Sequence, residues 1–333
     1  MNTRWPNRRT AARPAQRGAA ILMAMLTLVL VTTLVSAMMW RQWRGVELES
    51  AQRMRVQSAW ILTGALDWAR LILREDARQG GSDHLAEPWA VPLAPARLSS
   101  FLAAERGQAL VGDDTDPAQE AFLSGQMEDL QARLNVTNLV ENGQLHAASA
   151  AVWARLFKHL NLPQGELEAM TQRLLQASAS TVAGKANPLA PLSPHTVAEL
   201  AWLGVSPMTL RAIDPFVTLL PARTPVNLNT APPEVLLACV DGLELAQARQ
   251  LVQSRALKPI DTLVDAEQRI GNAAVHLDAA QHAVASRFFS VTGQLRLGQS
   301  TLQERSVLQR DGLDVKVLSR EREVVLDQER PLQ

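Results

Sequence analysis

The hydrophobic pattern divides the chain into an apolar run, an amphipathic helix, a helical middle and a closing set of strands. Residues 19–40 carry no charged side chain. At about 1.5 Å per helical residue, this run is long enough to cross a hydrocarbon core about 30 Å thick. Apolar side chains then recur at helical spacing over residues 54–72, and the pattern stops near Gln79, where two glycines follow. We therefore predict one long N-terminal helix whose second part packs on a core.

The pattern changes twice beyond this helix. Residues 82–119 are rich in proline, aspartate and glycine, which predicts an ordered loop, and the alternation in residues 121–139 favours a strand or hairpin. Seven segments between residues 146 and 285 then show helical spacing. They are residues 150–160, 165–177, 196–203, 207–213, 232–240, 245–255 and 260–265. After residue 286 the apolar period becomes two, which predicts three short strands that turn around Gly293, Gly298 and Gly312.

The charge distribution separates the start of the chain from the rest. Lys+Arg and Asp+Glu both total 33, but five of the arginines and no acidic residue lie in the first eighteen positions. The remainder is therefore acidic by five charges, which gives nucleic acid little electrostatic attraction to the body as a whole. Basic flanks of a membrane helix stay in the cytoplasm, so we expect residues 41–333 to lie across the membrane.

The side chains that usually carry catalysis are scattered. The single cysteine, Cys239, lies in an apolar segment and is expected to be a buried hydrophobe. The six histidines show no metal-ligand spacing, and the sequence contains no nucleophile motif or phosphate-binding glycine loop, so we expect neither an enzyme nor a required cofactor. Asp113, Asp114 and Asp116 offer the oxygen ligands that Ca²⁺ prefers, although a solvated acidic turn is the simpler interpretation.

Residues 225–255 raise the hypothesis of a DNA-binding protein. They predict two helices around a glycine turn, with Thr230 as the cap of the first helix and Pro232 and Pro233 in its first turn. This unit resembles a helix-hairpin-helix motif, whose glycine-rich hairpin binds DNA phosphates. Here Glu244 takes the place of the second glycine, and the surrounding residues include more acidic than basic side chains. We predict a scaffold and no nucleic-acid partner, with a membrane-anchored DNA-uptake protein as the alternative.

Residues 16–22 resemble the processing site of type IV pilin-like proteins, where a membrane peptidase cuts after a glycine and methylates the new terminus. The resemblance implies cleavage after Gly18 and a mature chain that begins with Ala19. Most members carry glutamate at the fifth mature position, where this chain has Met23. The K-type minor pseudopilins share this departure, since a tip subunit has no neighbouring amine to pair with a buried carboxylate. A signal peptide cut near residues 35–37 and an uncleaved anchor stay open from the residues alone.

Further segments resemble the K-type minor pseudopilins of type II secretion systems. They are residues 128–139, 227–236, 288–297 and 304–310. The resemblance implies an α+β, pilin-like fold, in which a long N-terminal helix packs on an antiparallel sheet and a large all-α domain with helix-hairpin-helix or SAM-like units is inserted. The expected division is a cleaved basic leader (1–18), a transmembrane part (19–40), a first pilin-like part (41–145), an inserted helical domain (146–285), and closing strands with a tail (286–333).

The same resemblance implies a function. The protein is expected at the tip of a pseudopilus, where it starts assembly and supports export of folded proteins from the periplasm across the outer membrane. The expected partners are I- and J-type minor pseudopilins, the major pseudopilin, the prepilin peptidase and the inner-membrane assembly platform. The chain is expected to cross the inner membrane once, with its N-terminus cytoplasmic and its body periplasmic. A minor pilin of a related type IV pilus is a further alternative, and structural Ca²⁺ is compatible with the family.

Overall fold

The computed structural model describes residues 17–98, 121–182, 190–272, 275–297 and 300–326. The chain forms two compact units, Met1–Trp60 and Ile61–Gln333. Helix α1 (Arg17–Gln79) contributes to both of them. In the first unit its residues 19–50 are all exposed. Within the described residues, α1 is the helix with a stretch long and apolar enough to cross a membrane.

The predicted end of the N-terminal helix is confirmed, because α1 ends at Gln79. Gly80 and Gly81 follow with φ angles of 68° and 114°. L-residues rarely adopt such backbone angles, and glycine adopts them without a steric penalty. The two glycines therefore stop the helix and turn the chain toward the loop that follows.

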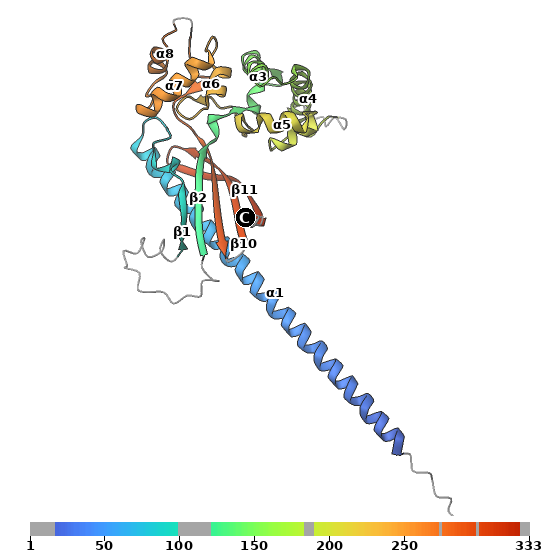
Figure 1. Cartoon of the computed structure of the whole chain (residues 1–333). Coiled ribbons are helices and arrows are strands. Elements are labelled where there is room, and N and C mark those ends of the chain that lie inside the picture. The colour runs from blue at the N-terminus through green and yellow to red at the C-terminus, as the bar shows by residue number, and fades with distance from the viewer. Residues whose placement is uncertain (1–16, 99–120, 183–189, 273–274, 298–299, 327–333) are drawn as a thin grey trace, which may run out of the picture. The chain divides into compact units, whose positions relative to one another are not determined.

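The second unit contains a five-stranded antiparallel sheet in the order β1-β2-β9-β10-β11 (Figure 1). The strands are β1 (Leu93–Arg97), β2 (Ala121–Asp129), β9 (Phe288–Leu297), β10 (Ser300–Asp311) and β11 (Asp314–Leu326). The helical region separates β2 from β9 in sequence, yet the two strands pair directly, with Asp129 opposite Phe289. The chain therefore leaves the sheet at the end of β2 and returns to it at the start of β9.

The closing strands are longer than the predicted ones, and one of the expected turns is wrong. Gly312, with a φ of 59°, does lie in the turn between β10 and β11. Gly293 instead lies inside β9, opposite Gly125 of β2. A Cβ atom on Gly293 would lie 3.2 Å from Cδ2 of Leu62 in α1. The glycine thus permits close helix packing, which a periodicity of two cannot distinguish from a turn.

Residues 61–79 of α1 pack on the sheet through an apolar core. Leu66 and Leu73 are buried against Phe289, together with side chains from β10 and β11. The side chains of Arg70 and Arg74 donate 3.0 Å hydrogen bonds to backbone oxygens near the start of β11. The predicted apolar face of this part of the helix is confirmed.

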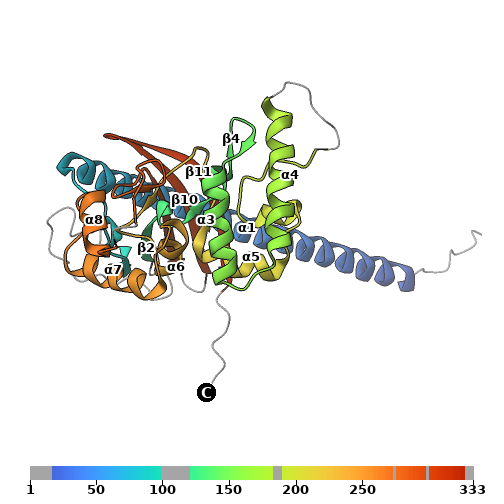
Figure 2. The ribbon, with the colours of Figure 1, turned by 90° about the horizontal axis from the view of Figure 1, so that it is seen from above.

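Helices gather at one end of the sheet (Figures 1 and 2). The α-helices are α3 (Ala147–His159), α4 (Gln164–Val182), α5 (Pro207–Ile213), α6 (Pro233–Cys239), α7 (Leu245–Leu257) and α8 (Leu263–Ile270). The 3-10 helices are η1 (Pro88–Ala90), η3 (Leu130–Ala132), η4 (Val136–Leu139), η5 (Ala198–Leu203) and η6 (Asp214–Phe216). One hydrophobic core runs through α3 to α8, so these helices pack as one body.

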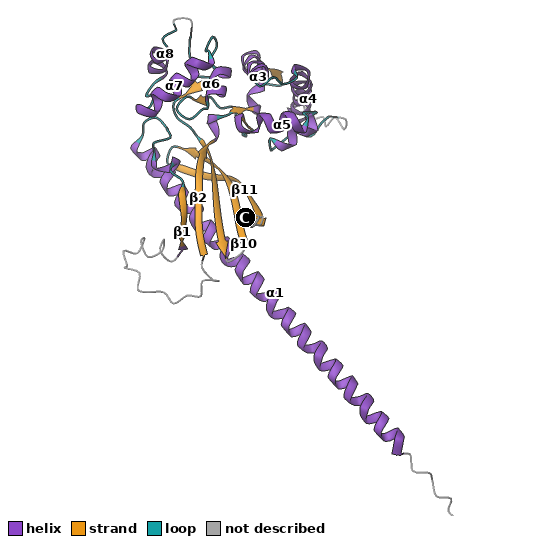
Figure 3. Cartoon of the chain, in the orientation of Figure 1, coloured by secondary structure: helices purple, strands orange, loops and turns teal. Residues whose placement is uncertain are grey.

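Pairs of two-residue strands accompany the helices (Figure 3). They are β3 (Leu134–Asn135) with β6 (Val217–Thr218), β4 (Val140–Glu141) with β5 (Gln144–Leu145), and β7 (Val226–Asn227) with β8 (His282–Ala283). The helix predicted at residues 196–203 is present as the 3-10 helix η5, Ala198–Leu203. One further prediction needs correction. The last helix begins at Leu263 instead of 260, because the side chain of Thr262 accepts the backbone N–H of Asp265 and caps it there.

The predicted strand over residues 121–139 is correct only as far as Asp129. The side chain of Asp129 accepts the backbone N–H of Gln131, and the side chain of Asn135 accepts that of Thr137. Such local bonds offer the backbone an alternative to a strand ladder and favour turns. The chain accordingly forms η3, β3 and η4 after β2.

Candidate functional site

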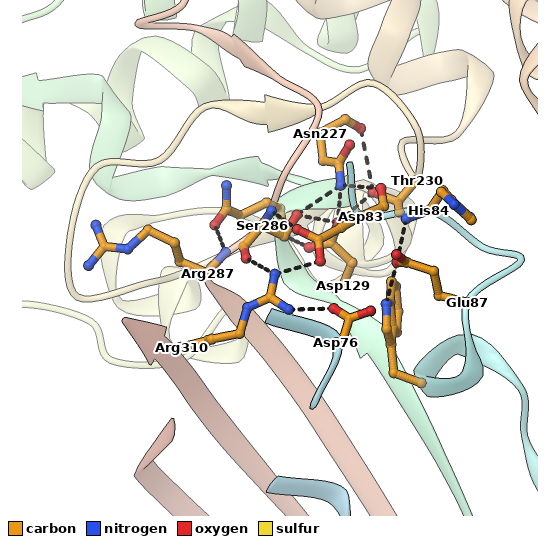
Figure 4. A network of polar contacts seen from close by, with 12 residues as sticks. Asp76, Asp83, His84, Glu87, Asp129, Asn227, Thr230, Ser286, Arg287 and Arg310 are labelled. Atoms are coloured by element: carbon orange, nitrogen blue, oxygen red, sulfur yellow. Dashed lines mark hydrogen bonds and ion pairs between the residues drawn. The ribbon is translucent and has the colours of Figure 1, made fainter. Parts of the chain in front are cut away.

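A network of buried polar side chains lies where the sheet meets the helical region (Figure 4). We call it the polar junction, and it comprises Asp76, Asp83, Asp129, Asn227, Thr230, Ser286 and Arg310. These residues come from α1, the loop after it, β2, β10 and the segments that lead into and out of the helices. No residue pattern of period two or 3.6 links them, so the sequence reasoning missed the junction as a site.

Asp129 stands at the centre of the polar junction. Its Oδ2 accepts hydrogen bonds from Asn227 Nδ2 at 3.0 Å, Thr230 Oγ1 at 2.6 Å and Ser286 Oγ at 2.6 Å. Its Oδ1 accepts the backbone N–H of Gln131 at 2.7 Å. Burial raises the pKa of Asp129, and the hydrogen bonds oppose that rise because they favour the charged form.

Arg310 joins the polar junction to α1. Its Nη1 lies 2.6 Å from Asp76 Oδ2, and its Nη2 donates to Asp83 Oδ1 and to the Ser286 carbonyl oxygen. Burial lowers the pKa of Arg310, but Asp83 and Asp76 outweigh this effect, so that its pKa is raised. Burial likewise raises the pKa of both aspartates, against the influence of Arg310. The guanidinium also lies 4.9 Å from the centre of the Phe289 ring.

In the segment from Asn227 to Thr230, the polar side chains form hydrogen bonds with residues from different parts of the chain. Asn227 Nδ2 donates to the Asp83 carbonyl oxygen at 3.1 Å as well as to Asp129. Asn229 exchanges two hydrogen bonds with the backbone of Ile260, at 2.8 and 2.9 Å. Thr230 was expected to cap α6, and this prediction is wrong, since its hydroxyl donates to Asp129 and Pro232 takes the cap position.

Asn135 and Asn138 form a second set of long-range hydrogen bonds. Asn135 donates to the Ala222 carbonyl oxygen at 2.8 Å and accepts the Leu220 N–H at 3.1 Å. Asn138 exchanges bonds of 2.7 and 3.0 Å with the backbone of Thr224. A buried asparagine can satisfy one donor and one acceptor of a neighbouring strand at once. Residues 220–224 are therefore held in place by side-chain hydrogen bonds, without the regular backbone hydrogen bonds of a strand pair.

The predicted processing residues lie in α1 or at its start. Gly18 and Ala19 belong to its first turn, and Met23 is 62% exposed. Asp113, Asp114 and Asp116 lie outside the described residues. Cleavage after Gly18, the tip-type role of Met23 and calcium binding therefore stay predictions.

Three other carboxylates come close enough together to suggest a cation site. Ligand oxygens of Asp76, Asp83 and Glu87 lie within 4.8 Å of one another. The guanidinium of Arg310 already pairs with both aspartates. Glu87 Oε2 accepts the His84 backbone N–H at 2.8 Å and Trp89 Nε1–H at 2.7 Å. Because these oxygens already have donors, the geometry favours an ion-pair network over a Ca²⁺ site.

The turn between α6 and α7 is the place where a helix-hairpin-helix would hold a phosphate. Gly242 has a φ of 75°, but Glu244 caps α7 and forms a capping box with Gln247. The carboxylate of Asp241 lies 3.0 Å from Arg155 Nη1. The Glu244 carboxylate thus lies at the start of α7, where a phosphate would have to bind, and its negative charge opposes phosphate binding.

Cys239 is buried in the hydrophobic core shared by α3 to α8, as predicted. Burial raises the pKa of its thiol to about 12. A thiol acts as a nucleophile or metal ligand in its deprotonated form, so this side chain is chemically inert at neutral pH. Cys239 fills space between the helices.

Comparison with known proteins points to one family. Two family models described as "Type II secretion system (T2SS), protein K" match residues 132–222 and 226–286. Type II secretion system protein K of Pseudomonas aeruginosa is 28% identical over 92% of both chains. The protein of the same name from Klebsiella pneumoniae is also 28% identical, over 92% of this chain and 96% of its own. That of Pectobacterium carotovorum is 24% identical, over 93% and 97%.

A solved structure has the same fold. It is described as the crystal structure of the GspK-GspI-GspJ complex from the type 2 secretion system of enterotoxigenic Escherichia coli. The similarity has a TM-score of 0.60 at 18% identity, and it covers 82% of this chain and 98% of the matched chain. The shared architecture is a long N-terminal helix with an antiparallel sheet and additional helices. Together with the relatives of nearly equal length, these matches show that the chain is similar over most of its length to type II secretion system protein K.

Proposed function

We propose that this chain is a minor pseudopilin at the tip of a type II secretion pseudopilus, where it starts assembly and supports export of folded proteins across the outer membrane. The observation that carries this proposal is the full-length correspondence with proteins named type II secretion system protein K, which covers 92–93% of this chain. We propose a role through surfaces rather than through an active site, and the same correspondence supports it.

The proposed topology follows from α1 and the leader. Residues 19–40 would cross the inner membrane, with the basic leader in the cytoplasm and the body in the periplasm. We propose that the prepilin peptidase removes residues 1–18 after Gly18 and methylates Ala19. Met23 would then occupy the fifth mature position, where a carboxylate without a partner would be costly in the bilayer.

The proposed partners are the I- and J-type minor pseudopilins, the major pseudopilin and the inner-membrane assembly platform. Support for the first two is that the structure with the same fold is a complex with GspI and GspJ. The finer division of the body is also proposed. Residues 146–285 would form an inserted domain with helix-hairpin-helix or SAM-like units, and residues 41–145 and 286–333 would form the pilin-like part.

Deletion of the gene tests the proposed function. Exported enzymes should accumulate, folded and active, in the periplasm, and expression of the full chain should restore their release. Strains that lack another essential component of the secretion system give the matched control for the amount retained. Normal secretion in a clean deletion would overturn the proposal.

The mass of the mature N-terminal peptide tests the proposed processing. N-methylated Ala19 supports the pilin-like route, because the peptidase cuts after Gly18 and methylates the new amine. A terminus near Met38 would instead indicate a signal peptide, and an intact Met1 would indicate an uncleaved anchor. Either of the last two results would contradict the proposed processing.

We also retain structural calcium as a proposal for Asp113, Asp114 and Asp116. Carboxylates in one loop are the ligand type that Ca²⁺ prefers. Calorimetric titration of the full chain with Ca²⁺ should show binding that is lost when all three aspartates are replaced by asparagine. Equal binding by both proteins would place any calcium elsewhere.

A further inference from the structure

Two tryptophans and two arginines stand together on α1 where the uncharged run ends. They are Trp40, Arg41, Trp43 and Arg44, and we call them the Trp/Arg girdle. The ring centres of the two tryptophans are 5.8 Å apart, and the guanidinium carbon of Arg44 lies 5.7 Å from the centre of the Trp40 ring. The tryptophans are 58% and 62% exposed. The girdle thus presents aromatic and cationic surface to its surroundings.

Among the described residues, the cations of the girdle have no carboxylate partner. Within the described residues, neither Arg41 nor Arg44 forms a salt bridge. Farther along the helix, Arg53 pairs with Glu49 at 2.6 Å. The positive charge of the girdle therefore stays available for an anion outside the chain.

The position of the girdle indicates which anion is near. Residues 19–40 of α1 span about 33 Å at 1.5 Å per residue, which matches a hydrocarbon core about 30 Å thick. The girdle then falls at the level of the lipid headgroups. Tryptophan is enriched at this level because its ring is amphipathic, and guanidinium groups bind phosphate through paired hydrogen bonds.

We propose that the Trp/Arg girdle binds anionic phospholipid headgroups and fixes the depth of α1 in the bilayer. The inference rests on the proposed single membrane anchor, and it adds a lipid preference and a set of positioning residues to it. In this arrangement the two tryptophans keep this part of α1 at the level of the lipid headgroups. Arg41 and Arg44 select negatively charged headgroups over zwitterionic ones. A second protein helix over the girdle would bury the same rings without any preference among lipids.

Quenching of tryptophan fluorescence by brominated lipids tests this proposal on the full chain. The protein is reconstituted in phosphatidylcholine vesicles with the same mole fraction of either brominated phosphatidylcholine or brominated phosphatidylglycerol. The chain has eight tryptophans, so the difference between the native protein and W40F/W43F isolates the girdle signal. We expect stronger quenching by the anionic lipid, equivalent to an enrichment of about two- to fivefold near the girdle. Bromine near the headgroup should quench more than bromine near the chain end.

Charge variants separate a lipid preference from simple insertion. R41Q/R44Q should lose the excess quenching by the anionic lipid, and R41K/R44K should retain most of it because the charge is kept. R53Q is the matched control, since Arg53 already has a carboxylate partner, and it should behave like the native protein.

Three outcomes would overturn the proposed lipid binding by the girdle. Equal quenching by the two lipids, or an excess that survives R41Q/R44Q, would exclude anionic lipid binding while the membrane anchor stands. Absence of quenching by every brominated lipid would show that α1 does not insert, and this result would reject the anchor and the girdle together.

Discussion

The sheet contacts its neighbours in two different ways. Along its face, Leu66 and Leu73 of α1 are buried against apolar side chains of the strands. At its end, Asp129 and Arg310 contact the helical region and the end of α1 through directional hydrogen bonds and ion pairs. Apolar burial is non-directional and tolerates small shifts, whereas a buried polar group without its partner destabilises the fold strongly. The apolar face therefore supplies stability, and the polar junction fixes one relative position of sheet and helices.

Removal of Arg310 should have the largest effect. Arg310→Met leaves the buried carboxylate of Asp83 and the half-buried one of Asp76 without their cation, and we expect the free energy of unfolding to fall by about 3–5 kcal/mol. Denaturant unfolding of the full-length chain in detergent measures this change. Arg53→Gln, in an exposed ion pair, is the control and should change stability by less than about 0.5 kcal/mol. A loss below about 1 kcal/mol for Arg310→Met would show that the junction adds little.

Truncation of a buried side chain on the apolar face should lower the free energy of unfolding somewhat less than Arg310→Met. It should also loosen a different region of the molecule. Leu73 is fully buried, and Leu73→Ala should lower the free energy of unfolding by about 2–5 kcal/mol through lost burial and a cavity. Hydrogen exchange should then increase in α1, while the amides of residues 227–230 keep their protection. Arg310→Met should show the reverse order. Equal exchange profiles for the two variants would contradict the separation into two kinds of contact.

The change of folding stability with pH should be the smallest of the three effects. Because the pKa of Asp129 is raised in the folded chain, its proton binds more tightly there than in the unfolded chain. This group therefore stabilises the fold fully below its unfolded pKa near 4, and the contribution is lost as the pH rises through the folded pKa. The expected slope for one proton is at most about 1.4 kcal/mol per pH unit.

Asp129→Asn separates this group from its neighbours in the same titration. The variant should show a shallower loss of stability with rising pH than the native chain. Asp76 and Asp83 also have raised pKa values and keep part of the slope. Stability that rises with pH across this range in the native chain would show that the hydrogen bonds to Asp129 outweigh its burial.

The apolar part of this architecture could be predicted from sequence, and the polar part could not. The helical spacing of residues 61–72 identified the face that packs on the sheet, because burial imposes a period on the chain. The partners of Asp129 lie about a hundred residues or more away, at Asn227, Thr230 and Ser286, and no local rule links such positions. The resemblance to the family did mark the segments that contain Asp129, Asn227 and Thr230.

Two errors have a common cause. Thr230 has the residue type of a helix cap, and Gly293 has the residue type of a turn. In the structure, each serves a long-range contact instead, Thr230 with Asp129 and Gly293 with Leu62. Local propensity is a weak guide where tertiary contacts select the same residue type for another purpose. For buried polar residues and glycines such as these, the residue type alone therefore does not predict the structural role.

The neighbouring exit and entry points of the helical region have a mechanical consequence. The chain leaves β2 at Asp129 and returns before β9 at Ser286, and the two side chains are joined by a 2.6 Å hydrogen bond. Without a further connection, a pull on the helices would load β2 and β9 at the same end and break their ladder one bond at a time. The ion pair of Arg310 with Asp76 gives the force a second path, into α1. In the proposed pseudopilus subunit, this second connection would carry tension from the helices past the pairing of β2 with β9.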